Sequence, residues 1–187
     1  MIVSKHRFST DDYHSMIDAG ILTENDRVEL IEGDVIETAA IGSRHAACVK
    51  RTAELLRDAL NKRALLGVQD PVILGDDSEP EPDLSVLVSN NAFYADAHPT
   101  ASDIYLLIEV ADSSLVYDMT VKLPLYARAG VPEVWLVNLV QNRVMVYRDL
   151  SSSGYTTEMS LTAGDSLSPV AFTDVVLDVA SVLLLSN

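Results

Sequence analysis

Short apolar runs alternate along the chain with stretches whose apolar residues recur at helical spacing. Three runs are rich in Val, Ile and Leu, are too short for helices and are bounded by Pro, Ser or Asp, which is typical of buried strands. They are EPEPDLSVLV (79–88), IYLLIEVADSS (104–114) and VPEVWLVN (131–138). Between the second and third runs, DMTVKLPLYARAG (118–130) has helical spacing and stops at Gly130. We therefore predict two strands, a helix and a third strand in this central part.

The flanking parts predict further helices and strands. Ser9 and the acids after it resemble the cap of a short helix that ends at Gly20. The longest helical pattern covers 43–66 and carries one apolar stripe. Alternation and turn residues predict strands in four further places, namely a hairpin at 27–37 around Gly33 and strands at 68–74, 143–147 and 155–159.

These elements predict one domain of mixed class. The 187 residues are enough to bury a sizeable core, and no repeat, low-complexity tract or linker divides them. We expect an α/β (α+β) protein whose single domain covers 1–187. The last segment, 172–185, predicts a strand or a helix, and its exposed apolar face would suit the contact of a homodimer.

Acidic residues stand where buried strands do not tolerate them. Asp83 opens the first central strand, and Glu109 interrupts the apolar run of the second. A carboxylate in such a strand costs several kcal/mol unless a cation meets it. Lys122, on the helix that follows, is one candidate for this cation, and a metal ion is the other. Glu29, in the predicted hairpin, gains a role only if it faces Asp83 and Glu109.

Three further residues are secondary candidates. His45 lies at the start of the apolar stripe of the long helix, where a histidine is more often a hydrogen-bonded core residue than a ligand or base. Asp118, Lys122 and Tyr126 recur every four residues and share one helix face. Pro124 lacks an N–H, so the helix either begins close to Lys122 or is kinked there.

Composition limits the class of protein. A single cysteine excludes an internal disulfide framework and fits a reducing compartment. We find neither a signal peptide nor an apolar run that would span a membrane, so we expect a cytoplasmic protein. The net charge of −15 argues against binding nucleic acid, because phosphates attract the opposite charge. The segment 43–64, however, is locally +4, with six basic and two acidic residues.

Few chemistries fit this sequence. It has no Gly-rich phosphate loop, no Cys/His cluster at zinc spacing and no GxSxG motif. The remaining acids are oxygen ligands, which suit Mg²⁺ or Mn²⁺, ions that take one or two carboxylates and complete their shell with water and phosphate. Such an ion can neutralise a phosphoryl group and activate water.

Several motifs together resemble a known family. They are VELIEGDVIE with Glu29, His45, EPDLSVLV with Asp83, IEVADSS with Glu109, and YDMTVKLPLYARAGVPEVWLVN, which is the most specific. In these motifs, from about 28 to 147, the chain is similar to the Uma-two family of putative restriction endonucleases, part of the PD-(D/E)XK nuclease superfamily. Where that superfamily commonly has its lysine, two residues after Glu109, this chain has Ala111. A lysine from the neighbouring helix, Lys122, would replace it.

The resemblance implies a restriction-endonuclease-like core, with a central mixed sheet flanked by helices and DNA as the substrate. It implies that Asp83 and Glu109 bind Mg²⁺ or Mn²⁺, with the carbonyl of Val110 as a further ligand. Glu29 would hold a second metal ion or a water, and Lys122 would polarise the attacking water.

Other interpretations of the same residues stay open. Asp83 could cap a strand, Glu109 could form a structural ion pair with Lys122, and Asp118 could be an N-terminal helix acid. The whole protein could be a non-catalytic interaction module that kept the fold, or a hydrolase of small phosphoesters.

Overall fold

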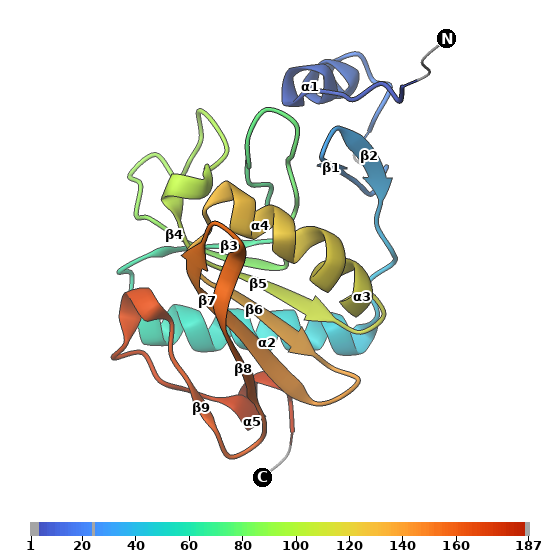
Figure 1. Cartoon of the computed structure of the whole chain (residues 1–187). Helices are drawn as coiled ribbons and strands as arrows, with labels where there is room; N and C mark the ends of the chain where they lie inside the picture. Colours follow the sequence, from blue (N-terminus) through green and yellow to red (C-terminus); the bar gives the residue numbers. More distant parts are fainter. Residues whose placement is uncertain (1–3, 24, 186–187) are drawn as a thin grey trace.

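The centre of the molecule is a six-stranded mixed sheet. The computed structural model describes residues 4–23 and 25–185. The strand order is β3-β4-β5-β6-β7-β8 (Figure 1). Its strands are β3 Leu65–Val68, β4 Leu84–Leu87, β5 Ile104–Ala111, β6 Val134–Asn138, β7 Arg143–Ser151 and β8 Gly154–Leu161. Strands β5 and β6 are parallel and every other neighbouring pair is antiparallel. This sheet confirms the predicted fold class.

Helices cover both faces of this sheet (Figure 1). On one face lies α2, Ser43–Leu60, whose stripe of Val49, Leu56 and Leu60 packs with the strand side chains Leu106 and Ile108. On the other face lies a helical segment made of α3 (Leu115–Tyr117), a π-helical turn, η2 (Asp118–Lys122), and α4 (Leu123–Ala129). Its residues join a second core with the side chains that point to that face.

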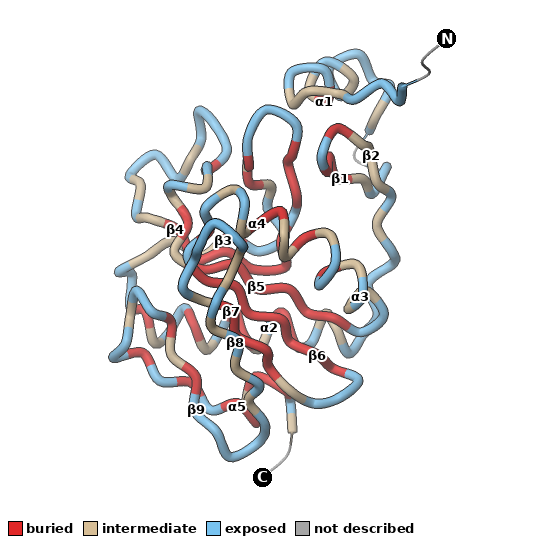
Figure 2. Tube along the Cα trace, viewed as in Figure 1, coloured by how far each residue is buried: buried red, intermediate tan, exposed pale blue. Residues whose placement is uncertain are grey.

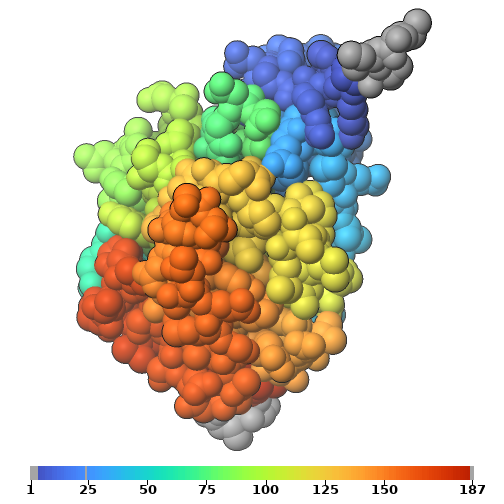
Figure 3. All heavy atoms as spheres, in the orientation of Figure 1, coloured from blue at the N-terminus to red at the C-terminus, as the bar shows by residue number. Residues whose placement is uncertain are grey.

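The central strands are buried because they are covered on both faces. All five residues of β6 and seven of the eight in β5 are buried, which explains why their sequences are continuous apolar runs and do not alternate (Figure 2). The tip of the β7–β8 hairpin lies beside α4 (Figure 3), and Tyr155 Oη donates to the carbonyl of Val131, just after this helix, at 2.7 Å. The segment from β5 to β6 is therefore the crossover of a parallel pair, and it carries the helix in which Lys122 lies.

The N-terminal part forms a small layer beside the main sheet. Helix α1, Thr10–Asp18, has the predicted cap, in which Ser9 and Asp12 form a reciprocal capping box. Strands β1 (Val28–Ile31) and β2 (Asp34–Glu37) form the predicted hairpin, with Gly33 at φ +77° in its turn. A bridge between Leu30 and Glu79 joins β1 to the loop before β4.

Two boundaries were predicted wrongly. The long helix ends at Leu60 rather than at 66, because Asn61 and Lys62 adopt left-handed backbone conformations, with φ +46° and +65°. The strand expected at 68–74 lies earlier, as β3, and antiparallel pairing with β4 fixes its register from Leu65 to Val68.

The apolar face expected to be exposed at the C-terminus is mostly buried, and only part of it, including Val176 and Leu184, is exposed. The segment contains short elements, namely η3 (Val170–Phe172), β10 (Leu177–Asp178), which pairs with β9 (Ser166–Leu167), and α5 (Val179–Val182). Five of its apolar side chains are buried in the same chain against α2: Val175, Leu177, Val179, Val182 and Leu183. This surface therefore gives no support to the predicted homodimer. In the part of the chain that the structure describes, no helix has the length and apolar character to cross a bilayer.

Candidate functional site

A cavity of about 670 Å³ opens between the N-terminal hairpin, the start of α2 and the α3–η2 segment. The predicted site residues that line it are Glu29, His45, Asp83, Glu109, Val110, Asp118 and Lys122. The structure therefore brings together residues that are widely separated in the sequence. Tyr126, the remaining candidate, lies fully buried behind the cavity.

Lys122 joins two of the carboxylates. Its Nζ donates to Glu29 Oε1 at 3.0 Å and to Glu109 Oε1 at 3.2 Å. All three side chains are buried, with Lys122 6% and the two glutamates 3% and 4% exposed. A lysine can reach the pair only because η2 lies in the crossover that follows β5, so that the helix returns over the strand that carries Glu109.

Asp83 is held beside Glu109 by the backbone. The N–H of Val110 donates to Asp83 Oδ2 at 2.8 Å, and His45 Nε2 lies 3.0 Å from the same oxygen. Gln69 Nε2 donates to the other oxygen, Oδ1, at 3.1 Å. Gln69 has a left-handed backbone, with φ +56°. Sequence reasoning missed Gln69, which follows β3 and had been expected inside a strand.

Asp118 and Tyr126 extend the network along the helix. Tyr126 Oη donates to Glu109 Oε1, and Ser114 Oγ donates to Asp118 Oδ2 at 2.7 Å. Both Asp118 and Tyr126 are buried, so the helix face that they share with Lys122 turns toward the interior. Pro124 falls in the first turn of α4, directly after the π-helical turn, as its missing N–H requires.

Burial and mutual repulsion disturb the ionisation of these groups. Burial raises the pKa of Glu109 to about 8, although Lys122 acts in the opposite direction. Burial also raises the pKa of Asp118, against the bond from Ser114. Burial lowers the pKa of Lys122, but Glu109 and Glu29 outweigh that effect and raise it above its ordinary value. The lysine is therefore a permanent cation, and the acids around it are crowded.

The contact with Asp83 favours the protonated, cationic form of His45. The hydrogen bond to Asp83 raises the pKa of the imidazole, while burial acts in the opposite direction. The bond fixes Nε2 toward Asp83 and leaves the other ring nitrogen, Nδ1, for another partner.

Several residues that line the cavity have buried polar atoms without a hydrogen-bond partner. Among the described residues, four buried side-chain polar atoms lack a hydrogen bond, and three of them belong to residues that line this cavity. They are Glu29 Oε2, His45 Nδ1 and Tyr117 Oη. Buried polar atoms are nearly always paired in native proteins, so such a concentration indicates a site that a ligand completes.

Tyr117 is the second residue that sequence reasoning did not select. The π-helical turn takes more residues per turn than an α-helix, and this brings Tyr117 onto the same side as Lys122. The sequence carries no signal for such a turn beyond Pro124. π-helical turns occur frequently at functional sites.

The donor atoms suit a hard divalent cation with few protein ligands. No group of three His, Cys, Asp or Glu side chains in the described residues is placed to hold a metal ion. Glu29 turns Oε1 to Lys122 and to the N–H of Glu81, and its Oε2 has no hydrogen-bond partner. A Mg²⁺ site needs only one or two carboxylates from the protein. Asp83 directly precedes β4, Glu109 lies near the end of β5, and both line the cavity.

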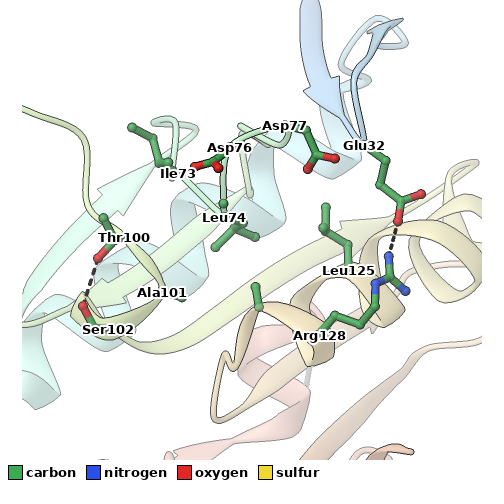
Figure 4. A pocket seen from close by; sticks show the side chains of 12 residues that line it. Glu32, Ile73, Leu74, Asp76, Asp77, Thr100, Ala101, Ser102, Leu125 and Arg128 are labelled. Atoms are coloured by element: carbon green, nitrogen blue, oxygen red, sulfur yellow. Dashed lines mark hydrogen bonds and ion pairs between the residues drawn. The ribbon is translucent and has the colours of Figure 1, made fainter. Parts of the chain in front are cut away.

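A second cavity, of about 760 Å³, shares no lining residue with the first (Figure 4). Leu74 and Leu125 line its apolar part, and the carboxylate of Glu32 at its edge is paired with Arg128. It contains no lysine and none of the predicted site residues. The first cavity is therefore the candidate site.

Comparisons with known proteins agree with this fold. The family model Uma2, described as "Putative restriction endonuclease", matches residues 10–180. The chain is also similar to a crystal structure described as that of a putative nuclease belonging to DUF820 from Anabaena variabilis ATCC 29413. The TM-score is 0.74 at 17% identity, over 95% of this chain and 98% of the other. No curated protein matches the chain. At this identity the crystal structure shows a shared fold.

Proposed function

Because this chain belongs to the Uma2 family, we propose that it is a nuclease, namely an endonuclease that hydrolyses DNA phosphodiester bonds with the help of a divalent metal ion. The observation that carries the proposal is the cavity in which Lys122, Asp83 and Glu109 converge beside three unpaired buried polar atoms. A phosphate with its attacking water would supply the missing partners.

Each residue has a distinct role in this proposal. Asp83 and Glu109, with the carbonyl of Val110, would hold Mg²⁺ or Mn²⁺. When bound, the ion would neutralise charge on the phosphate and make a water more acidic. Lys122 orients the attacking water and stabilises the negative charge that develops on the phosphate. Glu29 positions the ammonium of Lys122 through the 3.0 Å bond.

The hydrogen bonds to the carboxylates support these roles. Both oxygens of Asp83 are fixed, by Val110 N–H and His45 on one and by Gln69 on the other, so its carboxylate is held in one orientation. Tyr126 fixes Glu109 from behind. Such fixed groups lose little freedom when substrate arrives, which is the condition for effective electrostatic catalysis.

The test is nicking of supercoiled plasmid with Mg²⁺ or Mn²⁺, and with EDTA as the blank. We expect Asp83→Asn and Lys122→Met to lower the rate by about a hundredfold or more, because each removes a charged group at the reacting phosphate. Glu158→Gln, an exposed change on β8 outside the cavity, is the charge-matched control for Asp83→Asn and should leave the rate unaltered. Equal rates for wild type and Lys122→Met would refute the mechanism.

One observation favours a second candidate, a non-catalytic interaction module with the nuclease fold. Lys122 is paired with both Glu29 and Glu109 in the structure, so a cation already meets these acids without a metal ion. This candidate predicts no heat of Mn²⁺ binding by calorimetry and no change in melting temperature with EDTA. Binding of Mn²⁺ that Asp83→Asn abolishes would exclude it.

A further inference from the structure

The solvent side of α2 carries basic residues in a chain that is otherwise strongly acidic. Arg44, Lys50 and Arg57 are all exposed on this helix. Lys50 and Arg57 form no salt bridge with any described residue, whereas Arg51 pairs with Glu54 at 2.8 Å. The net charge of the whole chain is −15, and on this helix face Lys50 and Arg57 stand on either side of one exposed acid, Glu54.

Two of these cations lie in line along the helix axis. Lys50 and Arg57 are seven residues apart, which is about two helical turns, so they point to the same side and lie about 10 Å from each other. Arg44 lies six residues before Lys50, so it points about 120° away from that line around the helix. The distance of about 10 Å between Lys50 and Arg57 corresponds to about three base-pair steps of duplex DNA, at one charge per 3.4 Å on each strand.

The start of α2 lies at the cavity. His45 and Gly42, on either side of the residues that start α2, line the cavity. Arg44 lies between them and hydrogen-bonds Asn142 Oδ1 at 2.7 Å, which holds it at the edge of the molecule near the end of β6. Figure 1 shows that α2 runs along one face of the sheet, and residues on its outer side, including Lys50, Glu54 and Arg57, are exposed.

We propose that the outer side of α2 binds the phosphate backbone of duplex DNA and leads it to the cavity. This inference rests on the proposed function for the choice of partner. The contacts are to phosphates, so they supply affinity and position and carry no sequence preference. The acidic remainder of the surface repels DNA and so confines it to this face.

The expected loss of DNA affinity can be estimated from counterion release. Each phosphate contact gives a slope of about −0.9 in the plot of log binding constant against log salt. At 0.1 M salt, which is one decade below 1 M, each phosphate contact therefore increases the binding constant about eightfold, and two contacts increase it about sixtyfold. The double variant Lys50→Gln/Arg57→Gln should weaken binding at 0.1 M salt by about that factor and reduce the slope by about two.

The experiment measures fluorescence anisotropy of a labelled duplex against salt concentration, with EDTA present so that no cleavage occurs. The charge-matched control is Lys5→Gln/Arg128→Gln, which removes two cations that pair with Asp34 and Glu32 away from α2. This control should keep the wild-type slope. Glu54→Gln should tighten binding, because it removes an anion from the face and frees Arg51.

The outcomes separate this inference from the proposed function. Loss of affinity and slope in the α2 variant, with the control unchanged, supports the surface even if no preparation cleaves plasmid. Equal slopes for the α2 variant and the control overturn the surface, as does a wild type that does not bind duplex, whatever the cleavage assay shows. Circular dichroism should give the same melting temperature for all variants, since the altered side chains are exposed.

Discussion

Replacing Lys122 by Met leaves two buried carboxylates without their cation. The side chain is buried, and its Nζ contacts Glu29 and Glu109 at 3.0 and 3.2 Å. Met has a similar length and no charge, so the change removes the ion pairs and keeps most of the packing. We expect the folded state to lose stability for electrostatic reasons alone.

The expected loss of unfolding free energy can be worked out from the distance between Lys122 Nζ and Glu29 Oε1. At an effective dielectric constant of about 20, two unit charges 3.0 Å apart attract by about 5 kcal/mol. Burying the ammonium of Lys122 costs several kcal/mol of desolvation, which offsets part of the attraction in both ion pairs. Met has no charge and avoids this cost. The net loss should be about 3–5 kcal/mol, the range found when one partner of a buried pair is removed.

The loss should depend on pH. Burial already raises the pKa of Glu109 from 4.5 to about 8, and removal of Lys122 raises it further. A carboxyl whose pKa is higher in the folded than in the unfolded state destabilises the fold as pH rises through that interval. Both proteins share the unfolded-state pKa of Glu109, so their difference in stability varies only where the folded forms differ in protonation. The difference should grow as the pH rises above about 8, where Glu109 ionises in the wild type but stays protonated in Lys122→Met, and it should be constant below that pH.

Urea unfolding monitored by tryptophan fluorescence measures this loss. The single tryptophan, Trp135, is fully buried in β6 and reports unfolding of the central sheet. Adding Glu109→Gln to Lys122→Met should restore part of the stability, because it removes one of the unpaired charges. An unfolding free energy within about 1 kcal/mol of wild type at pH 8, or no recovery in the double variant, would refute the reasoning.

Three further predictions concern other buried groups. Burial raises the pKa of the Cys48 thiol to about 11, so its reaction with a disulfide reagent at pH 8 should be slow in the folded protein and fast in urea, and fast labelling without urea would contradict the buried position. Glu133 is fully buried and accepts from Trp135 Nε1, from Arg148 Nε at 2.7 Å and from the N–H of Val170. Arg148→Met should therefore cost about 3–5 kcal/mol in urea unfolding, and a cost below about 1 kcal/mol would mean that the other donors suffice. Mn²⁺ at a hundred times its dissociation constant should stabilise the wild type by about 2.7 kcal/mol, and the same stabilisation in Asp83→Asn would place the ion elsewhere.

The central strands could be predicted because strands that are buried on both faces have continuous runs of apolar residues in the sequence. Strands β5 and β6 are runs of apolar residues, and the acids that interrupt such runs stand out. The capped helix at Ser9 and the hairpin around Gly33 also follow local rules, and both were confirmed. Ends of elements depend on less visible features. The apolar stripe of α2 continues into Leu65 and Leu66, but left-handed conformations at Asn61 and Lys62 turn those residues into β3.

The contacts within the site could not be predicted from spacing alone. The sequence left Lys122 and a metal ion as alternative cations for Glu109, and the structure places Lys122 Nζ 3.2 Å from Glu109 Oε1. The partner of Asp83 is a histidine that is 38 residues away, and only the register of β4 against β5 together with the position of α2 brings them together. Tyr117 depends on a π-helical turn, and Gln69 on a left-handed loop residue, neither of which has a distinct sequence pattern.

The parallel pairing of β5 and β6 also determines how the cavity can change shape. The helical crossover is connected at its two ends to the paired strands β5 and β6. Glu109 and Lys122 therefore move together and cannot separate as the two sides of a hinged loop would. Glu29, in contrast, comes from a hairpin outside the six-stranded sheet. A displacement of that hairpin would halve the number of carboxylates that hold the ammonium, while the sheet itself stays intact.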